Sequence, residues 1–308
     1  MIHDNHGRPV LNLRISVTQR CNLKCPYCHR EGEVANPSTE MTEDEIARIV
    51  GIAVGLGISR VKLTGGEPLL RSDIVNIVKN IAGLRGLRDL SMTTNGTRLA
   101  SLAKGLREGG LNRVNISIPS LDAGTYRALM GGDLRDVLKG IRAAVDAELF
   151  PVKMNMLVLK NVNEHEIPKM ISFAEHSGTI LQLIELEPVN LSASYYRRYH
   201  PDLNGVEEEL KKQARRVVTR EDMQNRKVYF LPRVKVEVVH PIENTEFCLC
   251  CTRLRVTSDG RLKPCLMRSN NLVDMITPLR NGADDEELKR LFLKAVKRRE
   301  PYYKMKSK

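Results

Sequence analysis

Hydrophobic residues along the first 190 positions alternate between two patterns. Short runs rich in aliphatic and β-branched residues predict strands, and longer stretches with apolar residues three and four positions apart predict amphipathic helices. The predicted strands cover residues 11–17, 60–64, 87–93, 113–118, 152–159 and 180–186. Helices are predicted from residue 42 to 57, after residue 72, through residue 106, from 134 to 147, and from Asn163 onward.

Two of these helices carry start signals. Thr42 followed by Glu45 is typical of a capping box, and Asn163 followed by Glu166 has the same spacing. Gly57 supplies the expected end of the first helix. Strict strand–helix alternation favours parallel strands joined by right-handed crossovers.

Six such units are visible, whereas a complete barrel of this type needs eight. We therefore expect an α/β fold, a partial (β/α)6 TIM-like barrel whose active site lies at the carboxyl ends of the strands. The rhythm changes after Glu187. A charged helix is predicted near residues 207–217, a β-like run at 227–239 and a basic helix near 284–298. We predict a core domain over 1–190 and a smaller C-terminal α+β domain over 191–308 that binds a cluster and closes the mouth of the barrel.

Composition and charge place the chain among ordinary globular proteins of barrel size. Its 308 residues are 42% hydrophobic, with no apolar run close to a membrane span and no signal-peptide core near the start. A cytoplasmic protein without membrane contact is expected. The net charge of +12 suits a polyanionic partner such as a nucleoside triphosphate or a nucleic acid, although part of it belongs to solvated helix faces.

Seven cysteines occupy two short segments, which favours metal ligation over a disulfide framework. Cys21, Cys25 and Cys28 follow the first predicted strand in a Cys-x3-Cys-x2-Cys loop. Three thiolates this close can hold three irons of a [4Fe–4S] cluster and leave the fourth iron for a small molecule. The alternatives are a zinc site, which needs four protein ligands when structural, and a purely structural cluster.

This loop resembles the defining motif of the radical S-adenosylmethionine (SAM) superfamily, including an aromatic residue, Tyr27, before the last cysteine. The turn Gly65-Gly66-Glu67-Pro68, one strand–helix unit later, resembles a second mark of that superfamily. The resemblance implies that a reduced [4Fe–4S] cluster cleaves bound SAM, and that the resulting 5′-deoxyadenosyl radical removes a hydrogen atom from a substrate.

Cys248, Cys251 and Cys265 form a second set of three, followed closely by Arg253 and Arg255. With its surroundings, this set resembles the GTP 3′,8-cyclase family, also called molybdenum cofactor biosynthesis protein A, over nearly the whole chain. The resemblance implies a second [4Fe–4S] cluster whose free iron binds the guanine of GTP. Cys250 is expected to be a bystander, and a zinc ribbon that recruits it remains the alternative for this segment.

Matching the family's motifs position by position implies further contacts. SAM would contact Tyr27, Gly66 and Ser117. GTP would contact Arg14, Lys62, Thr93, Lys153, Arg253, Leu254 and Arg255. Guanidinium forks suit guanine edges and phosphate oxygens. Catalytic groups beyond the clusters are not assigned.

The chain departs from the family in three places. Ser117 begins Ser-Ile-Pro-Ser-Leu-Asp rather than Ser-Leu-Asp. Gln182 and Glu187 stand where many members have a phosphate-binding Arg and a Met near SAM. The chain ends in basic residues up to Lys308 instead of a glycine pair.

The resulting hypothesis is a lyase that cyclises GTP to 3′,8-cyclo-7,8-dihydroguanosine 5′-triphosphate, the first step of molybdenum cofactor biosynthesis. Expected partners are GTP, an electron donor, a cyclic pyranopterin monophosphate synthase that takes the product and, in a homodimer, a second copy of the chain. The alternatives are another radical SAM enzyme with an auxiliary cluster and a zinc-bearing nucleic-acid-binding protein. The absence of Trp and the 4% aromatic content argue against nucleic acid as a partner.

Overall fold

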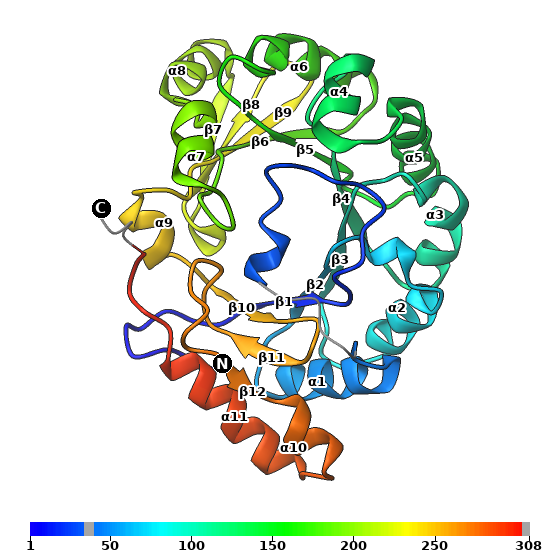
Figure 1. Ribbon diagram of the computed structural model, residues 1–308, viewed down its shortest axis with the longest axis vertical. Coiled ribbons are helices and arrows are strands. Elements are labelled where there is room, and N and C mark those ends of the chain that lie inside the picture. Colours follow the sequence, from blue (N-terminus) through cyan, green and yellow to red (C-terminus); the bar gives the residue numbers. More distant parts are fainter. Residues whose placement is uncertain (34–39, 304–308) are drawn as a thin grey trace.

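The strands of the protein form one curved sheet that surrounds a central space (Figure 1). The computed structural model describes residues 1–33 and 40–303. Within these residues the sheet has twelve strands in the order β12-β11-β10-β1-β2-β3-β4-β5-β6-β9-β8-β7. They are β1 (Asn12–Ser16), β2 (Arg60–Thr64), β3 (Asp89–Thr94), β4 (Arg113–Ser117), β5 (Lys153–Leu157), β6 (Ile180–Ile184), β7 (Arg216–Arg220), β8 (Arg226–Phe230), β9 (Lys235–Val239), β10 (Arg253–Val256), β11 (Arg261–Lys263) and β12 (Val273–Asp274).

Strands β1 to β6 are the six predicted strands, and they pair in parallel in chain order. Their connecting helices lie on the outside of the sheet (Figure 1). These helices are α1 (Glu43–Gly55), α2 (Ile74–Ala82), α3 (Leu99–Glu108), α4 (Ala123–Met130), α5 (Leu134–Asp146) and α6 (Ile167–His176). The predicted partial barrel is therefore confirmed. Below, its mouth is the end at which β1 to β6 finish and its base is the end at which they begin.

Helix α1 illustrates how the sequence determines these elements. Thr42 and Glu45 form the predicted capping box, in which the Thr42 side chain accepts from the Glu45 N–H and the Glu45 side chain accepts from the Thr42 N–H. Ile46, Ile49 and Val50 are fully buried against the sheet. The main hydrophobic core is the layer between the strands and their outer helices.

The C-terminal part of the chain extends both edges of this six-stranded core. Strand β9 pairs in parallel with β6, and β10 pairs in parallel with β1. The additional helices are α7 (Ala193–Tyr199), α8 (Asn204–Gln213), α9 (Thr245–Leu249), α10 (Ile276–Arg280) and α11 (Asp285–Lys297). Helix α11 contains the predicted basic helix and packs against α1 (Figure 1). The sheet is continuous across the predicted domain boundary at 190/191, which stays a prediction.

The structure corrects or refines three details of the predicted elements. The charged helix ends at Gln213. Val217 belongs instead to β7, because the β-branched run that follows the helix pairs antiparallel with β8. The β-like run predicted at 227–239 is confirmed, and it consists of two antiparallel strands, β8 and β9. Asn163 precedes a short 3-10 helix, Glu164–Glu166, as the predicted helix start requires, but its side chain caps neither that helix nor α6. Its side chain binds the main chain of Leu157 and Leu159, and α6 begins at Ile167.

The C-terminal part of the chain contacts the six-stranded core at both the mouth and the base of the barrel. At the mouth, Ser258 binds the Glu33 carboxylate, and Lys263 donates to the carbonyl oxygen of Gly32 over 3.1 Å. At the base, Asp222 between β7 and β8 forms an ion pair of 2.6 Å with Arg60 at the start of β2. The Asp222 carbonyl oxygen also accepts from the Thr252 hydroxyl just before β10. The β7–β8 hairpin, which forms one edge of the sheet, thus contacts the start of β2 and the segment before β10 across the open side.

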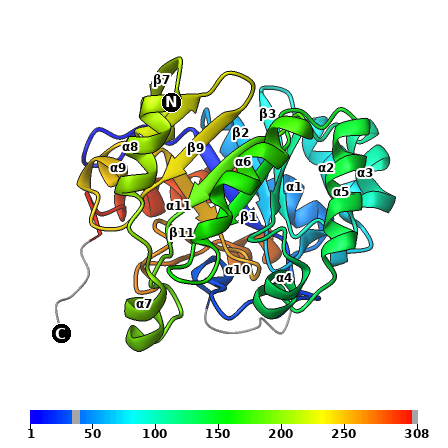
Figure 2. The ribbon, with the colours of Figure 1, turned by 90° about the horizontal axis from the view of Figure 1, so that it is seen from above.

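The view from above separates the two ends (Figure 2). Helices α4 and α7 project at the same end as the blue loop that follows β1. Throughout residues 1–33 and 40–303, no helix is both long enough and apolar enough to cross a membrane.

Candidate functional site

A cavity of about 570 Å³ runs along the axis of the barrel. Its lining includes Arg60 and Asp89 at the base and Gly65 and Gly66 at the mouth. The volume falls in the range of small-molecule and cofactor sites. One cavity therefore extends from the base to the mouth of the barrel.

The first cysteine set lies at the mouth, where Cys21, Cys25 and Cys28 all line the cavity as free thiols. Burial, together with the neighbouring Cys28 and Cys21, raises the pKa of Cys25 to about 12. The thiol of Cys25 also lies 3.3 Å from the Met130 sulfur. Cluster or metal binding would have to supply the positive charge that ionises these thiols.

Within residues 1–33 and 40–303, no three His, Cys, Asp or Glu side chains are placed to hold a single metal ion. All seven cysteines belong to those described residues. The ligands of a zinc ion surround one atom, whereas the thiolates of a [4Fe–4S] cluster each bind a different iron. Each assigned set offers three thiolates, which suits a [4Fe–4S] cluster with one open iron, whereas a structural zinc ion needs four protein ligands.

The glycine turn after β2 packs directly on the main chain next to the first cysteine set. A Cβ at Gly66 would lie 2.2 Å from the Arg20 carbonyl oxygen, and one at Gly65 would lie 2.3 Å from that of Thr18. Only glycine permits this approach. The adjoining Glu67 is fully buried and accepts from the Thr94 hydroxyl and from the Asn95 N–H, both over 2.6 Å. Glu67 thus fixes the ends of β2 and β3 together.

The three residues that the family resemblance assigns to SAM also line the mouth of the cavity. The Tyr27 hydroxyl donates to the Met130 sulfur over 3.0 Å. Ser117 ends β4, and Gly66 follows β2. The structure brings all three to the side of the cavity that holds the first cysteine set.

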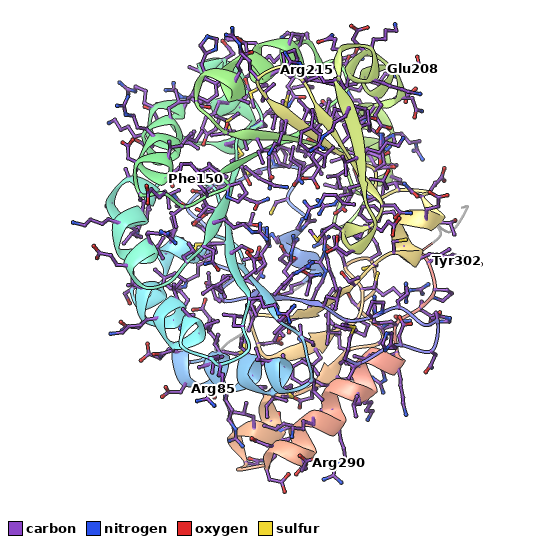
Figure 3. The ribbon with its side chains drawn as sticks, turned by 180° about the vertical axis from the view of Figure 1, so that it is seen from behind. Arg85, Phe150, Glu208, Arg215, Arg290 and Tyr302 are labelled. Carbon is purple, nitrogen blue, oxygen red and sulfur yellow. The ribbon has the colours of Figure 1, made fainter. Side chains whose placement is uncertain are left out.

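Cationic side chains outnumber anionic ones along the cavity walls between the mouth and the base. Nine described Arg and Lys residues line the cavity, against five Asp and Glu residues. The nine are Arg14, Arg60, Lys62, Arg113, Lys153, Arg220, Arg226, Arg253 and Arg255. Other basic residues, such as Arg85, Arg215 and Arg290, lie on the outer surface (Figure 3). Part of the positive charge of the protein therefore lies on the walls of the cavity, where it favours an anionic ligand.

Glu31 organises the cations nearest the mouth. Its carboxylate binds Arg255 and lies 3.5 Å from Arg14, and it accepts from the Thr64 hydroxyl over 2.8 Å. Although burial acts in the opposite direction, Arg14 and Arg255 lower the pKa of Glu31 to about 2. This carboxylate therefore stays ionised and holds both guanidinium groups in place.

Glu237 does the same for cations from strand β5 and the hairpin. It binds Lys153, and its distances to Arg226 and Arg220 are 3.0 Å and 3.7 Å. Burial opposes ionisation, but Arg226 and Lys153 lower the pKa of Glu237 to about 2. Three cations therefore share one carboxylate, which leaves a positive excess at this wall.

Lys62 and Arg253 have no carboxylate partner among the described residues. Lys62 donates to the Asn115 side chain over 2.9 Å. Burial, together with Arg113 and Arg14, holds the pKa of Lys62 well below its usual range. Burial and the charges of Arg14 and Arg226 do the same for Arg253. Buried cations of this kind cost free energy unless an anion accompanies them.

The second cysteine set lies behind the cavity wall. Cys248 is in α9, Cys251 precedes β10 and Cys265 follows β11. These thiols do not line the cavity themselves, but their neighbours Phe247 and Leu266 do. Although burial opposes it, Arg299 and Arg253 lower the pKa of the Cys251 thiol, which favours the thiolate that a metal needs.

Most of the predicted site residues meet in this one cavity. Thr93, Gln182 and Glu187 line it together with the cations and the first cysteine set. Leu254 does not. It is fully buried in the core, on the opposite face of β10 from Arg253 and Arg255, so a contact with GTP would have to come from its main chain.

Sequence reasoning missed the contribution of the β7–β8 hairpin. Arg220 and Arg226 enter the cavity from either side of a short turn. The only signal was a turn-like stretch at 221–225 between two basic residues, and it says nothing about where the hairpin packs. Glu31, three residues after Cys28, was missed for the same reason.

Comparisons with known proteins agree with this geometry. Residues 15–174 match the family described as Radical SAM superfamily, and residues 179–305 match Molybdenum Cofactor Synthesis C. A protein of Methanothermobacter marburgensis named probable GTP 3′,8-cyclase is 50% identical over 304 residues, covering 98% of this chain and 99% of its own. One of Thermococcus kodakarensis with the same name is 52% identical over 312 residues, covering 99% and 100%.

Solved structures show the same fold at low sequence identity. Streptococcus suis SuiB bound to precursor peptide SuiA has a TM-score of 0.64 and 18% identity, covering 84% of this chain and 60% of SuiB. His6-tagged anSMEcpe with bound AdoMet has a TM-score of 0.56 and 20% identity, covering 85% and 76%. Together with the full-length relatives, these matches show that the chain belongs to the radical SAM superfamily and, within it, to the GTP 3′,8-cyclase family.

Proposed function

We propose that the protein converts GTP to 3′,8-cyclo-7,8-dihydroguanosine 5′-triphosphate, the first step of molybdenum cofactor biosynthesis. The observation that carries this proposal is a single cavity with three thiols at its mouth and an excess of cations along its walls. A radical generated at the mouth would meet a polyanionic substrate held below it. Relatives that match the whole chain are named for this reaction.

At the mouth, Cys21, Cys25 and Cys28 would hold one [4Fe–4S] cluster with SAM beside Tyr27, Gly66 and Ser117. The close packing of Gly66 on the main chain of residue 20 supports a main-chain contact with SAM, because it leaves no side chain in the way. When bound, the cluster and SAM supply the one-electron chemistry that produces a 5′-deoxyadenosyl radical.

Farther in, Cys248, Cys251 and Cys265 would hold the second [4Fe–4S] cluster and direct it toward the guanine of GTP. Arg14, Lys62, Thr93, Lys153, Arg253, Leu254 and Arg255 would contact GTP. Among these, Lys62 and Arg253 lack a carboxylate partner in the described chain and are best placed to receive phosphate oxygens.

Gln182 leaves its position on β6 without a cation, and the hairpin makes up for it. Glu237 stands opposite Gln182 on the adjacent strand, and its carboxylate gathers Arg226 and Arg220. We assign these two arginines to the triphosphate as well. The protein's task is then to orient the ribose toward the mouth and to exclude water from the radical.

The pathway implies further partners. An electron donor must reduce the first cluster, and a cyclic pyranopterin monophosphate synthase would take the product. A cytoplasmic location and a homodimer remain predictions.

The test is anaerobic incubation of the reconstituted protein with GTP, SAM and a strong reductant, followed by mass spectrometry. The proposal expects 5′-deoxyadenosine together with a product of the same mass as GTP. Deoxyadenosine with unaltered GTP would retain radical SAM chemistry but reject the substrate, and it would favour another radical SAM enzyme with an auxiliary cluster. A colourless protein that holds zinc would reject both.

A further inference from the structure

Both ends of the described chain meet behind the second cysteine set. The Asp4 carboxylate, whose side chain is fully buried, forms ion pairs of 2.8 Å with Arg8 and 3.1 Å with Arg299. Arg8 and Arg299 are themselves only 7% and 4% exposed. We call these three residues the terminal clamp.

Each arginine of the terminal clamp fixes the main chain of one cysteine. Arg8 donates to the carbonyl oxygen of Cys248 over 2.8 Å, and Arg299 donates to that of Cys251. A planar guanidinium with five donors can hold a carboxylate and main-chain oxygens at the same time. The two cysteines therefore owe their relative placement to residues 240 and 48 positions away in the sequence.

The segment after α11 completes the enclosure. It passes α9 on its way to the C-terminus, near the labelled Tyr302 (Figures 1 and 3). Arg8 binds the carbonyl oxygens of Glu300 and Pro301 over 2.6 Å and 2.9 Å. The Tyr303 ring lies 5.9 Å from the guanidinium of Arg268, three residues after Cys265.

The charges of the clamp do not balance by themselves. Two buried guanidinium groups share one carboxylate, so one positive charge remains. A buried excess cation is costly unless a negative group faces it. Three thiolates around a four-iron cluster are such a group. Hydrogen bonds and charges next to a cluster also set its reduction potential.

We propose that Asp4, Arg8 and Arg299 are positioning residues of the second cluster. They hold the segment from Cys248 to Cys251 in its ligating arrangement and stabilise the negative charge of the cluster. The inference rests on the proposed function, because it assumes that the second cysteine set binds a [4Fe–4S] cluster.

The experiment compares Arg299→Gln, Arg299→Lys and the outer-surface variant Arg290→Gln with the wild type after anaerobic reconstitution. Iron per chain, the redox titration of the second cluster and SAM cleavage without GTP are measured on each. Wild type and Arg290→Gln should bind about eight irons, and Arg299→Gln about four. SAM cleavage should stay within about twofold in all variants, because the first cluster lies elsewhere.

Arg299→Lys keeps the charge but loses the fork. Arg299→Lys should recover more than half of the iron that Arg299→Gln loses. Any second cluster that remains in Arg299→Gln should have a lower midpoint potential than the wild type. The midpoint potential of the second cluster in Arg299→Lys should lie closer to the wild-type value. A folded Arg299→Gln protein with eight irons and an unchanged potential would overturn the terminal clamp.

If Arg299→Gln does not fold, the Arg8→Lys variant is measured instead to test the proposal. That variant keeps its charge but loses the fork that binds Cys248, Glu300 and Pro301 together, and unchanged second-cluster iron in it would overturn the proposal. A wild-type protein that binds only about four irons would overturn the two-cluster function and the clamp with it.

Discussion

Lys153 and Glu237 form a buried ion pair that crosses strand β6 next to the cavity, which Lys153 lines. Lys153 is on β5 and Glu237 is on β9, and β6 lies between these strands. Their side chains are 9% and 1% exposed. Arg226 shares the same carboxylate, so the pair belongs to a group of cations that one anion holds together. Changing either member should therefore affect both stability and GTP binding.

Replacing Glu237 with Gln should lower the free energy of unfolding by about 3 kcal/mol at pH 7. The Glu237 pKa is about 2 in the folded protein and 4.5 ordinarily, so its contribution is complete above pH 4.5. It is lost as the pH falls from 4.5 toward 2. Chemical denaturation should show wild type and Glu237→Gln converging in acid. Glu209→Gln, an exposed change on α8, serves as the control, and parallel curves for Glu237→Gln and wild type would contradict the assignment.

GTP binding should weaken as the pH rises through about 8. Burial lowers the pKa of Lys153 from 10.5 to about 8, so this side chain loses its charge about 2.5 pH units below an exposed lysine. Calorimetric titration with GTP from pH 7 to 9.5 should show the loss. Lys153→Arg should bind with little change over that range, since arginine stays protonated. Identical pH profiles for the two proteins would exclude Lys153 from the phosphate site.

The ion pair between Asp222 and Arg60 should affect the coupling of SAM cleavage to GTP cyclisation more than it affects the free energy of unfolding. Both side chains are partly exposed, at 44% and 37%, so the pair should contribute under about 1 kcal/mol. Asp222→Asn should free the hairpin at the base and raise the amount of deoxyadenosine formed per cyclised GTP. Arg233→Gln removes an ion pair to Glu175 elsewhere and should leave that ratio unchanged. A normal ratio in Asp222→Asn would show that the hairpin does not hold the substrate.

Substituting Gly66 with Ala should reduce SAM affinity at least tenfold. The new Cβ would lie 2.2 Å from the Arg20 carbonyl oxygen, so the glycine turn must move away from the first cysteine set. Gly205→Ala meets nothing within 4 Å and should bind SAM as the wild type does. Equilibrium dialysis with labelled SAM measures both. Normal binding by Gly66→Ala would mean that SAM does not contact this turn.

Cys250 should not be an iron ligand. Cys250→Ser is expected to retain about eight irons and full cyclase activity, whereas Cys251→Ser should lose about four irons and all cyclisation of GTP. The two residues are adjacent, so general disturbance of the segment would affect both variants alike. Iron loss in Cys250→Ser, together with full content in Cys251→Ser, would reverse the ligand assignment.

Local patterns were sufficient to predict the barrel. Each of β1 to β6 lies in a short stretch that contains aliphatic or β-branched residues at close intervals, and the Thr42 capping box formed as expected. The signals were weaker after Glu187. The β-branched run that includes Val217 follows a helical stretch directly, and its partner β8 decides in favour of a strand. Asn163 shows the same limit of local patterns. The spacing to Glu166 predicts a helix cap, but the Asn163 side chain binds the main chain of Leu157 and Leu159, at and just after the end of β5.

The candidate site was predictable wherever it depends on spacing along the chain. Cysteines three and four residues apart must lie close together, and residues at the ends of parallel strands must share one end of the barrel. The contributions of Arg226 and Glu31 depend on contacts between distant segments. Nothing local in the sequence shows that a hairpin near residue 222 reaches the start of β2. The terminal clamp, which joins residues 4 and 299, lies beyond local inference for the same reason.

The pairing of β10 with β1 and of β9 with β6 has a consequence for biosynthesis on the ribosome. When the first six strands have emerged, both edges of their sheet still lack a neighbour, and exposed edges of this kind invite association with other chains. The first cysteine set is displayed long before the second set has been translated. A nascent chain arrested at this stage would be a natural client for chaperones, and cluster loading would proceed in two separate stages.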